Sequence, residues 1–345
     1  MTQKSDLTGQ RKIVKTILVT GGCGFIFSNF IRYMLSKYPE YRIINLDNLS
    51  YSGLLSNTQD FMQHPNYKFV KGDIRKPETY EHIFKSEKID CIINGAAQTH
   101  VDRSILNSSE FIDTNVLGTQ KLLEKALEFE IPLFIQVGTD EEYGSIEAGS
   151  FTEEARLNPS NPYSASKAAA SLLALSYYRT FDLPVIITRS SNVFGPFQFP
   201  EKFIPLFITN ALEDKTCPLY GTGQNIRDWI YVLDNCRAHD FILHKGRPGE
   251  IYNISAGNER TNLEVVESLK RFLPELKWEF VKDRPGHDKR YSINSEKLRN
   301  LGWQPEVSFE EGLEKTVKWY KENKDWWKKI KTGEAFENYY KKQYE

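Results

Sequence analysis

Six short apolar runs, separated by segments with helical spacing, constrain the fold of this chain more than any other feature: KTILVT, RIINLD, YKFVKG, IDCIING, PLFIQVG and LPVIITR. Nearly continuous branched apolar runs of this length are typical of strands that are buried on both faces of a parallel sheet. Helical patterns lie between several of them, for example at 28–38, 78–88 and 110–130. This alternation predicts an α/β fold with a doubly wound parallel sheet and right-handed crossovers.

The sequence changes character at about Pro196. Loops rich in proline, glycine and aromatic residues follow, with shorter helical patterns at 263–272 and 310–323. We interpret this part as a smaller α/β lobe folded onto the sheet, with some segments that return to it. The predicted organisation is a sheet domain, a lobe and two terminal extensions, at 15–195, 196–330, and 1–14 with 331–345.

The last segment, KWYKENKDWWKKIKTGEAFENYYKKQYE, mixes aromatic residues with lysines. Such a mixture is found in proteins whose aromatic side chains stack on nucleic-acid bases. We favour an amphipathic terminal helix, whose aromatic residues pack on the body of the protein while its lysines stay in solvent.

Charge and cysteine content exclude several classes of protein. With 45 basic and 46 acidic side chains the net charge is −1, so no overall field attracts nucleic acid or an anionic membrane. The N-terminal segment lacks the apolar core of a signal peptide, and no run approaches the roughly 18 apolar residues of a membrane span. The four cysteines are scattered, which indicates reduced thiols and no metal site. We expect a cytoplasmic protein without nucleic-acid or membrane partners.

A glycine-rich segment, Thr20-Gly21-Gly22-Cys23-Gly24, joins the first apolar run to a helical pattern. In this context the backbone N–H groups of a helix N-terminus hold a pyrophosphate. Gly21 permits the tight turn and Gly24 the close approach, whereas the third glycine of a Rossmann fingerprint, here Phe27, serves helix packing. Asp47 ends the second run, where a carboxylate binds ribose hydroxyls and repels a 2′-phosphate. The sequence therefore predicts NAD rather than NADP; the competing interpretation is a plain tight turn.

Tyr163 and Lys167 are four residues apart in NPYSASKAAA, on one face of a predicted helix. An ammonium favours the phenolate and lowers the pKa of a tyrosine from about 10, more so beside a positively charged nicotinamide. Tyr163 can then act as a base on a substrate hydroxyl. Thr139, at the end of the fifth run, is the third member of this predicted site. The alternative is a pair on the surface of a helix.

Asp140 and Glu141 follow Thr139 directly, at the strand end where open α/β sheets bind ligands. Two adjacent carboxyl groups can have separated pKa values, so that one stays protonated as an acid while the other is ionised as a base. This combination suits the elimination of water from adjacent carbons. Taken alone, a DEE run is more often a solvated turn; its position beside Thr139 favours the catalytic interpretation.

Together these motifs resemble the extended short-chain dehydrogenase/reductases, and specifically the nucleotide-sugar 4,6-dehydratases of the dTDP-glucose type. The resemblance runs from about Lys15 to Trp327 and rests on TGGCGFI, LDNLSYSG, GDI, AAQTHVDRSI, TDE, NPYSASKA, TRSSNVFGPFQFPEKFIP, PLYGTGQNIRDW and DRPGHDKRY. The first motif and the Tyr/Lys pair are shared by short-chain enzymes in general. The TDE triplet, RDW and RPGHD are typical of the dehydratases.

The resemblance implies two sets of binding residues. NAD is expected in the sheet domain, beside Gly21, Gly24, Phe25, Ile26, Asp47, Asn48, Ser50, Gly53, Asp73, Ile74, Ala96, Ala97, Thr114, Tyr163 and Lys167. The nucleotide-diphosphate hexose is expected mainly in the lobe, beside His100, Asn192, Glu201, Lys202, Arg227, Asn262, Arg284 and His287. Arg227 and Arg284 suit the diphosphate because a guanidinium matches paired oxygens. A structural histidine is an equally good interpretation of His100.

The implied reaction is redox-neutral and regenerates NAD. Tyr163 takes the C4 hydroxyl proton while hydride leaves C4, and Thr139 hydrogen-bonds the same oxygen. Glu141 then removes the C5 proton, Asp140 protonates the C6 hydroxyl, and hydride returns to C6 to give a 4-keto-6-deoxy sugar. The family also pairs subunits through helices that correspond to 116–127 and 163–177, so we expect a homodimer.

Four residues depart from the family pattern, which usually reads GFIGS, a large apolar residue before Ala96, and STDEVYG. This chain has Phe27, Gly95, Gly138 and Glu142 at these positions. Since the first and fourth strands are neighbours in a doubly wound sheet, we hypothesise that the Phe27 ring fills the volume left by Gly95. Gly138 and Glu142 have no such explanation, and the charge of Glu142 is expected to raise the pKa values of the adjacent acids.

Three functions remain open at this point. The first is dehydration of dTDP-glucose, and the second is the same reaction on UDP-glucose or UDP-N-acetylglucosamine. The second is motivated by AAQTHVD, since the glutamine is typical of the eukaryotic UDP-glucose enzymes. An epimerase or decarboxylase has no need of Asp140 and Glu141. The third is an NAD-binding protein without catalysis.

Overall fold

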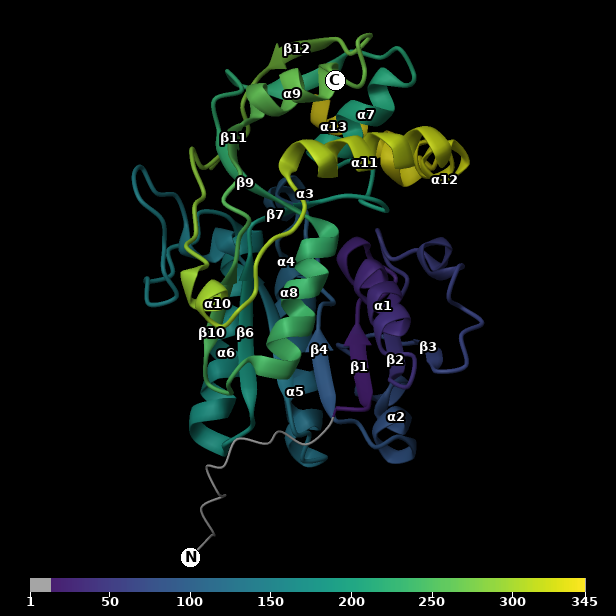
Figure 1. The fold of residues 1–345 in the computed structure, drawn as a ribbon, viewed down its shortest axis with the longest axis vertical. Helices are drawn as coiled ribbons and strands as arrows, with labels where there is room; N and C mark the ends of the chain where they lie inside the picture. The colour runs from purple at the N-terminus through teal and green to yellow at the C-terminus, as the bar shows by residue number, and fades with distance from the viewer. Residues whose placement is uncertain (1–13, 345) are drawn as a thin grey trace, which may run out of the picture.

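The computed structural model describes residues 14–344, and at its centre lies a seven-stranded sheet (Figure 1). The strand order is β10-β6-β5-β4-β1-β2-β3, and every neighbouring pair is parallel. The strands are β1 (Thr16–Thr20), β2 (Arg42–Asp47), β3 (Tyr67–Lys71), β4 (Cys91–Asn94), β5 (Phe134–Thr139), β6 (Val185–Ser190) and β10 (Ile251–Ile254). The predicted doubly wound parallel sheet is confirmed, and the six apolar runs form its first six strands.

Helices cover both faces of this sheet. On one face α1 (Phe25–Lys37) packs against α8 (Val232–Lys245), and on the other α5 (Thr119–Glu128) packs against α6 (Pro162–Phe181). Successive residues of β1 serve opposite faces: Ile17 belongs to the first core cluster and Leu18 to the second. This is the two-residue period of a strand that is buried on both sides.

Two of the predicted helical segments are interrupted. The segment 78–88 divides into a short turn, Pro77–Thr79, and α2 (Glu81–Ser86). The segment 110–130 begins with α4 (Ser109–Phe111) and passes through a π-helical turn, Ile112–Gly118, before α5. Such turns are frequent at functional sites, and this one contains Thr114, which lines the cavity described below.

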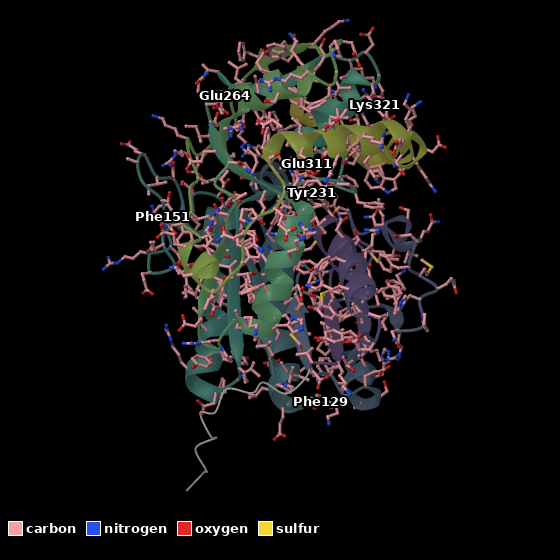
Figure 2. The ribbon with its side chains drawn as sticks, viewed as in Figure 1. Phe129, Phe151, Tyr231, Glu264, Glu311 and Lys321 are labelled. Carbon is pink, nitrogen blue, oxygen red and sulfur yellow. The ribbon has the colours of Figure 1, made fainter. Side chains whose placement is uncertain are left out.

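The second lobe lies at the carboxyl ends of the strands (Figure 1). It contains a sheet of β7 (Asn192–Phe194), β9 (Ile226–Tyr231) and β11 (Glu259–Thr261), and a pair formed by β8 (Cys217–Tyr220) and β12 (Trp278–Val281). Its helices include α7 (Phe203–Ala211), α9 (Asn262–Lys270) and α11 (Phe309–Glu322). Tyr231 lies where the lobe joins the sheet domain, and from there the chain returns through α8 to β10 (Figure 2). The helix α10 (Glu296–Asn300) also packs on β10.

The C-terminal segment forms two helices, α12 (Lys324–Lys331) and α13 (Glu334–Tyr344). Trp327 is fully buried, so an aromatic residue does pack on the body as predicted. The prediction that the lysines stay in solvent is wrong for Lys331, which is buried. Its ammonium lies 2.7 Å from a Glu213 carboxylate oxygen and donates to Asn210 Oδ1 at 2.8 Å. A buried charge with such partners avoids most of the desolvation penalty.

The hypothesis that Phe27 fills the space beside Gly95 is confirmed. Phe27 is 4% exposed, and a Cβ atom built at residue 95 would overlap the Cε2 and Cδ2 atoms of its ring. The ring also meets Phe30 and His239 edge-on, with centroids 5.7 and 5.6 Å apart. The substitution of glycine by phenylalanine in the first motif is therefore compensated by packing, away from the phosphate-facing glycines.

Exchanging these two residues tests that compensation. The variants Phe27→Gly and Gly95→Phe are each expected to lower the free energy of unfolding, the first through a cavity and the second through overpacking. In the double variant about 1–3 kcal/mol of the summed loss should be recovered, because residues in contact couple. Urea unfolding of the four proteins measures this coupling, and strictly additive losses would contradict it.

Within residues 14–344, no helix combines the length and apolar character needed to cross a membrane. The predicted absence of an N-terminal signal peptide concerns residues outside the described part of the chain.

Candidate active site

A cavity opens at the carboxyl ends of the strands, where β1 and β4 lie side by side although their connections leave in opposite directions. This is the position at which open α/β sheets bind ligands. Of the fifteen residues predicted to bind NAD, fourteen line this cofactor-side cavity: Gly21, Gly24, Phe25, Ile26, Asp47, Asn48, Ser50, Gly53, Ile74, Ala96, Ala97, Thr114, Tyr163 and Lys167. The exception is Asp73, whose carboxylate is instead held by Arg75 at 2.6 Å.

The glycine loop has the geometry that its sequence predicts. Gly21 adopts a φ of +73°, and a Cβ atom there would lie 2.8 Å from the Cα atom of Ala96, so a side chain is excluded on two grounds. Gly24 is the N-cap of α1 and provides no side-chain cap for its N–H groups. Asp47 accepts hydrogen bonds from the backbone N–H groups of Cys23 and Leu49, at 2.9 and 2.8 Å. The N-terminus of α1 therefore faces the cavity without a side-chain cap, and the carboxylate of Asp47 is fixed beside it.

Thr139, Tyr163 and Lys167 meet at the floor of the cofactor-side cavity. Asn161 caps α6 by accepting from the N–H of Ser164 at 3.0 Å, and proline occupies the first helical position. The helix thus begins one residue before Tyr163, and Lys167 lies one turn further on the same face.

The prediction that Lys167 lowers the pKa of Tyr163 is wrong for this structure. Burial and the negative charge of Glu141 raise the pKa of Tyr163 well above its usual value. The Lys167 ammonium donates to the carbonyl oxygen of Val137, and burial lowers its own pKa to about 8. The enclosed position of the phenol and the carboxylates around it outweigh a lysine that is directed elsewhere.

The two adjacent acids have different environments, as the sequence predicts. Asp140 is 3% exposed, and burial together with the charge of Glu141 raises its pKa well above the usual range. Its Oδ1 atom accepts from Thr139 Oγ1 at 3.2 Å, while its buried Oδ2 atom has no partner within residues 14–344. Glu141 is more open and accepts from Ser164 Oγ at 3.3 Å and from the Tyr291 hydroxyl at 3.5 Å. The pair therefore consists of a buried acid and a better-solvated carboxylate.

Glu142 does not point toward Asp140, so the expectation that its charge would raise the pKa of that acid is wrong. Burial and the charge of Glu141 are the largest causes of the raised Asp140 pKa, whereas Glu142 contributes to the raised pKa of Tyr163. The fully buried carboxylate of Glu142 accepts from Arg189 Nε at 2.7 Å and from Ser171 Oγ at 3.0 Å. Arg189, from β6, therefore neutralises the charge.

Gly138 explains how this carboxylate fits beneath the active site. A Cβ atom at residue 138 would overlap Glu142 Oε1 and lie 2.7 Å from the carbonyl oxygen of Thr188. Gly138 and Glu142 are thus a second compensating pair, parallel to Phe27 and Gly95. The same Oε1 atom accepts from the backbone N–H of Thr139 at 3.2 Å. Glu142 therefore helps to hold the backbone of Thr139, a predicted catalytic residue.

A second cavity lies between the sheet and the lobe. All eight residues predicted to bind the nucleotide sugar line it: His100, Asn192, Glu201, Lys202, Arg227, Asn262, Arg284 and His287. Glu141, Asn192 and Lys202 line both cavities, which makes them neighbouring parts of one cleft. We refer to the second part as the lobe-side cavity.

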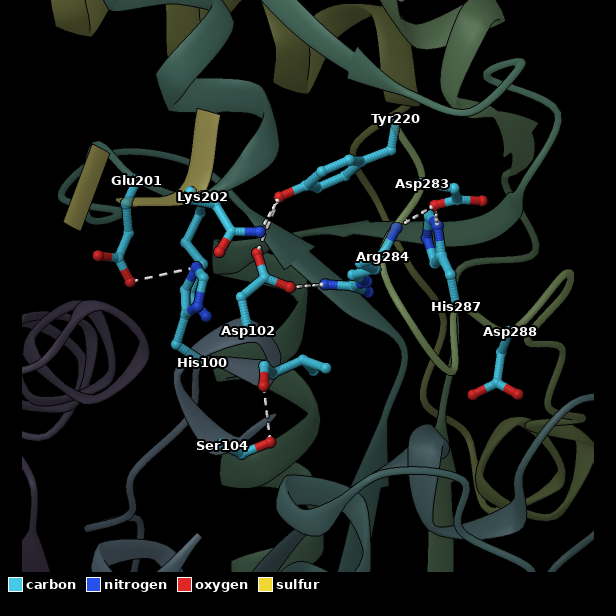
Figure 3. A network of polar contacts seen from close by, with 12 residues as sticks. His100, Asp102, Ser104, Glu201, Lys202, Tyr220, Asp283, Arg284, His287 and Asp288 are labelled. Atoms are coloured by element: carbon cyan, nitrogen blue, oxygen red, sulfur yellow. Dashed lines mark hydrogen bonds and ion pairs between the residues drawn. The ribbon is translucent and has the colours of Figure 1, made fainter. Parts of the chain in front are cut away.

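Two arginines give the lobe-side cavity positive charge. The Arg227 guanidinium stacks on Tyr291, 4.1 Å from the ring centroid, and Arg284 donates to Asp102 at 2.7 Å (Figure 3). His100 is buried, with its Nε2 atom 3.2 Å from a Glu201 oxygen. Burial and nearby positive charges hold the pKa of His100 well below its usual value, so it is neutral. It lines the cavity, and its contact with the sugar stays a prediction.

Sequence reasoning gave no role to several residues that shape this cleft. Ser164 and Tyr291 contact Glu141, Asp102 holds Arg284, and Tyr220 donates to Asp102 at 3.2 Å. All four stand inside motifs that carried the resemblance, namely NPYSASKA, DRPGHDKRY, AAQTHVDRSI and PLYGTGQNIRDW. Their presence in those motifs could have identified them as residues of the site. Their contacts could not be predicted, because their partners are distant in sequence.

Comparison with known proteins agrees with this geometry. Residues 18–316 match the family model described as GDP-mannose 4,6 dehydratase. The chain is 50% identical to the low-salt glycan biosynthesis protein Agl12 of Haloferax volcanii, covering 88% of this chain and 98% of that protein. It is 44% identical to a dTDP-glucose 4,6-dehydratase of Streptomyces niveus, covering 92% and 96% respectively.

Solved structures show the same relationship. The crystal structure of dTDP-glucose 4,6-dehydratase from Bacillus anthracis in complex with NAD superposes with a TM-score of 0.86 at 52% identity, covering 92% of this chain and 99% of that one. The chain therefore belongs to the GDP-mannose 4,6 dehydratase family, on an extended short-chain dehydrogenase/reductase fold. The predicted enzyme class, a hydro-lyase of the nucleotide-sugar 4,6-dehydratase type, is confirmed.

Proposed function

We propose that this chain is an NAD-dependent enzyme that converts dTDP-glucose to dTDP-4-keto-6-deoxyglucose. The observation that carries the proposal is the position of Asp140 and Glu141: both line the cofactor-side cavity together with Tyr163, and Glu141 also lines the lobe-side cavity. The sequence identities of 44% and 52% with two dTDP-glucose 4,6-dehydratases, in alignments that cover nine-tenths of the chain, support the choice of substrate.

The cofactor-side cavity fits NAD. The uncapped N-terminus of α1 and the side-chain-free surface at Gly21 suit a pyrophosphate, and Asp47 suits the adenosine ribose. Thr114, Tyr163 and Lys167 would lie toward the nicotinamide end. When bound, NAD accepts the hydride from C4 of the sugar and later returns it to C6.

Three residues would act on the C4 hydroxyl group of the sugar during its oxidation. Tyr163 receives its proton, and Thr139 donates a hydrogen bond to the same oxygen. Because the pKa of Tyr163 is raised in this structure, deprotonation of the phenol needs positive charge beside it, which a bound nicotinamide would supply. Lys167 lines the same cavity and would help to hold the cofactor there.

Asp140 and Glu141 would carry out the elimination. Once C4 is a ketone, the C5 proton is acidic, and Glu141 removes it. Asp140 donates its proton to the C6 hydroxyl, so that water leaves. The unpartnered Oδ2 atom of Asp140 provides the position from which that proton is given.

The elimination step should depend on pH through Asp140. Since its pKa is raised, the acid is protonated below that pKa and loses its proton as the pH rises through it. We expect the rate of dehydration to be flat on the acidic side of this pKa and to fall by about tenfold per pH unit above it. Single-turnover rates across pH measure this, and a rate that rises with pH through the alkaline range would contradict the assignment.

One experiment tests the function as a whole. The purified protein is incubated with dTDP-glucose, UDP-glucose and UDP-N-acetylglucosamine, and the products are examined by mass for loss of water and in base for the 4-keto chromophore. Dehydration of dTDP-glucose is expected. No dehydration of any of the three, with NAD retained, would favour the non-catalytic NAD-binding protein instead.

The UDP-sugar alternative receives no support from the residue that suggested it. Gln98 lines the cofactor-side cavity rather than the lobe-side cavity. Its amide donates to Glu110 Oε1 at 2.9 Å. A residue in that position can influence the cofactor end of the cleft, but it is not placed to select a nucleobase.

The quaternary state is also part of the proposal. Leu117, Leu172 and Phe181, on or beside the helices expected to pair subunits, are 49%, 56% and 50% exposed. Exposed large apolar residues in one region favour a subunit contact, so we propose a homodimer, in the cytoplasm. The mass in solution by light scattering tests it, and a monomer at micromolar concentration would contradict it.

A further inference from the structure

The C-terminal helix α13 packs against both parts of the cleft. Phe336 is buried in a cluster with Phe199 and Leu206. Phe199 lines the cofactor-side cavity, and Leu206 lines the lobe-side cavity. Tyr51, next to the predicted NAD residue Ser50, packs on the same cluster. This helix thus lies against the walls of the site rather than at a remote end of the lobe.

A chain of hydrogen bonds links the end of α13 to the arginine predicted to bind the diphosphate. Gln343 Nε2 donates to the Tyr220 hydroxyl at 2.6 Å, and that hydroxyl donates to Asp102 Oδ2 at 3.2 Å. Asp102 Oδ1 accepts from Arg284 at 2.7 Å. Figure 3 shows Tyr220 and Arg284 approaching Asp102 from two sides.

The hydrogen bond that Gln343 donates determines where the proton of the Tyr220 hydroxyl points. A tyrosine hydroxyl has one proton, so when the Gln343 amide donates into its oxygen, that proton is directed to Asp102. Asp102 is then held on one oxygen by Tyr220 and on the other by Arg284. The buried Nε atom of Arg284 has no partner within residues 14–344, which leaves it free to bind an anion.

We propose that Gln343 is a positioning residue of the nucleotide-diphosphate site, which acts through Tyr220 and Asp102 on the orientation of Arg284. The ligand class rests on the function proposed above. A guanidinium binds paired phosphate oxygens only in a narrow orientation, so loss of the amide donor weakens ligand binding. Chemistry at the sugar, which takes place beside Tyr163, is not affected directly.

The first test compares two alanine variants on the same helix. Gln343→Ala removes the donor, and Asn338→Ala, at an exposed position of α13, is the matched control. The dissociation constant for dTDP, measured by calorimetry on the NAD-bound protein, and the KM for dTDP-glucose should each rise about tenfold in Gln343→Ala. The kcat should stay within about twofold, as a binding effect requires. Equal binding by Gln343→Ala and Asn338→Ala would overturn the proposal.

Two further variants separate positioning from packing. Gln343→Glu keeps the size of the side chain but provides no donor, so it should bind dTDP at least as weakly as Gln343→Ala. In a Tyr220→Phe background, Gln343→Ala should have almost no further effect, because its route to Asp102 is already lost. Additive losses would overturn the proposal, and so would normal binding by Gln343→Glu. If the unsubstituted protein binds dTDP but dehydrates no sugar, the proposed reaction fails while this test stands; if it binds no dTDP, both fail.

Discussion

Replacing Asp140 by asparagine is expected to lower the rate of water elimination by about 10²- to 10⁴-fold, the usual contribution of a general acid. Asparagine has the same shape and can still accept the hydrogen bond that Thr139 Oγ1 donates at 3.2 Å. What it lacks is a proton to give to the C6 hydroxyl. The measurement is the formation of the 4-keto-6-deoxy product in a single turnover.

A second readout shows whether only the last step is lost. In deuterated water, Glu141 in Asp140→Asn should still exchange the C5 proton of the bound ketone, so recovered dTDP-glucose gains deuterium at C5. In Tyr163→Phe no ketone forms, and both the product and the exchange should disappear. Tyr163 and Asp140 line the same cavity, so their positions alone do not distinguish their roles. The difference in C5 exchange between the two variants assigns the residues to different steps.

The matched control is Glu147→Gln, which removes an exposed carboxyl seven residues further along the chain. It should dehydrate dTDP-glucose at the rate of the unsubstituted protein. If Asp140→Asn retained full dehydration, or if it lost C5 exchange together with product, Asp140 would not be the acid of the elimination.

The sequence predicts most of the sheet domain because its signals are local. Each apolar run becomes one strand, and the order of motifs along the chain places Gly21, Asp47, Thr139 and Tyr163 at the same edge. The contact between Phe27 and Gly95 was also predictable, since both residues follow strands that must be neighbours in a doubly wound sheet.

Partners from distant parts of the chain were not predictable in this way. Glu142 looked like a third acid in a row, yet a short turn, Asp140–Tyr143, directs it beneath the strand end, where Arg189 of β6 meets it. The sequence around Lys331 is typical of a solvated lysine, but its ion-pair partner, Glu213, lies more than a hundred residues earlier in the chain. Helical periodicity identifies which face of a helix is buried, but it does not identify the charged residue that packs against that face.

Breaking the buried ion pair of Glu142 and Arg189 is expected to have the largest effect on stability. Glu142→Leu leaves a guanidinium whose side chain is 2% exposed and which still donates to the Tyr143 hydroxyl at 2.9 Å, but without the carboxylate that balances its charge. Removing one member of a buried pair costs about 3–5 kcal/mol, since it leaves an uncompensated charge. Urea unfolding of the protein without ligand measures the loss. A decrease below about 1 kcal/mol would contradict the assigned pairing.

Removal of both charges provides the control. The double variant Glu142→Leu with Arg189→Met replaces the pair by apolar side chains of similar volume, which is often close to neutral, so its loss should be far smaller than either single loss. A double variant as unstable as the single variants would show that the charges of Glu142 and Arg189 do not balance each other.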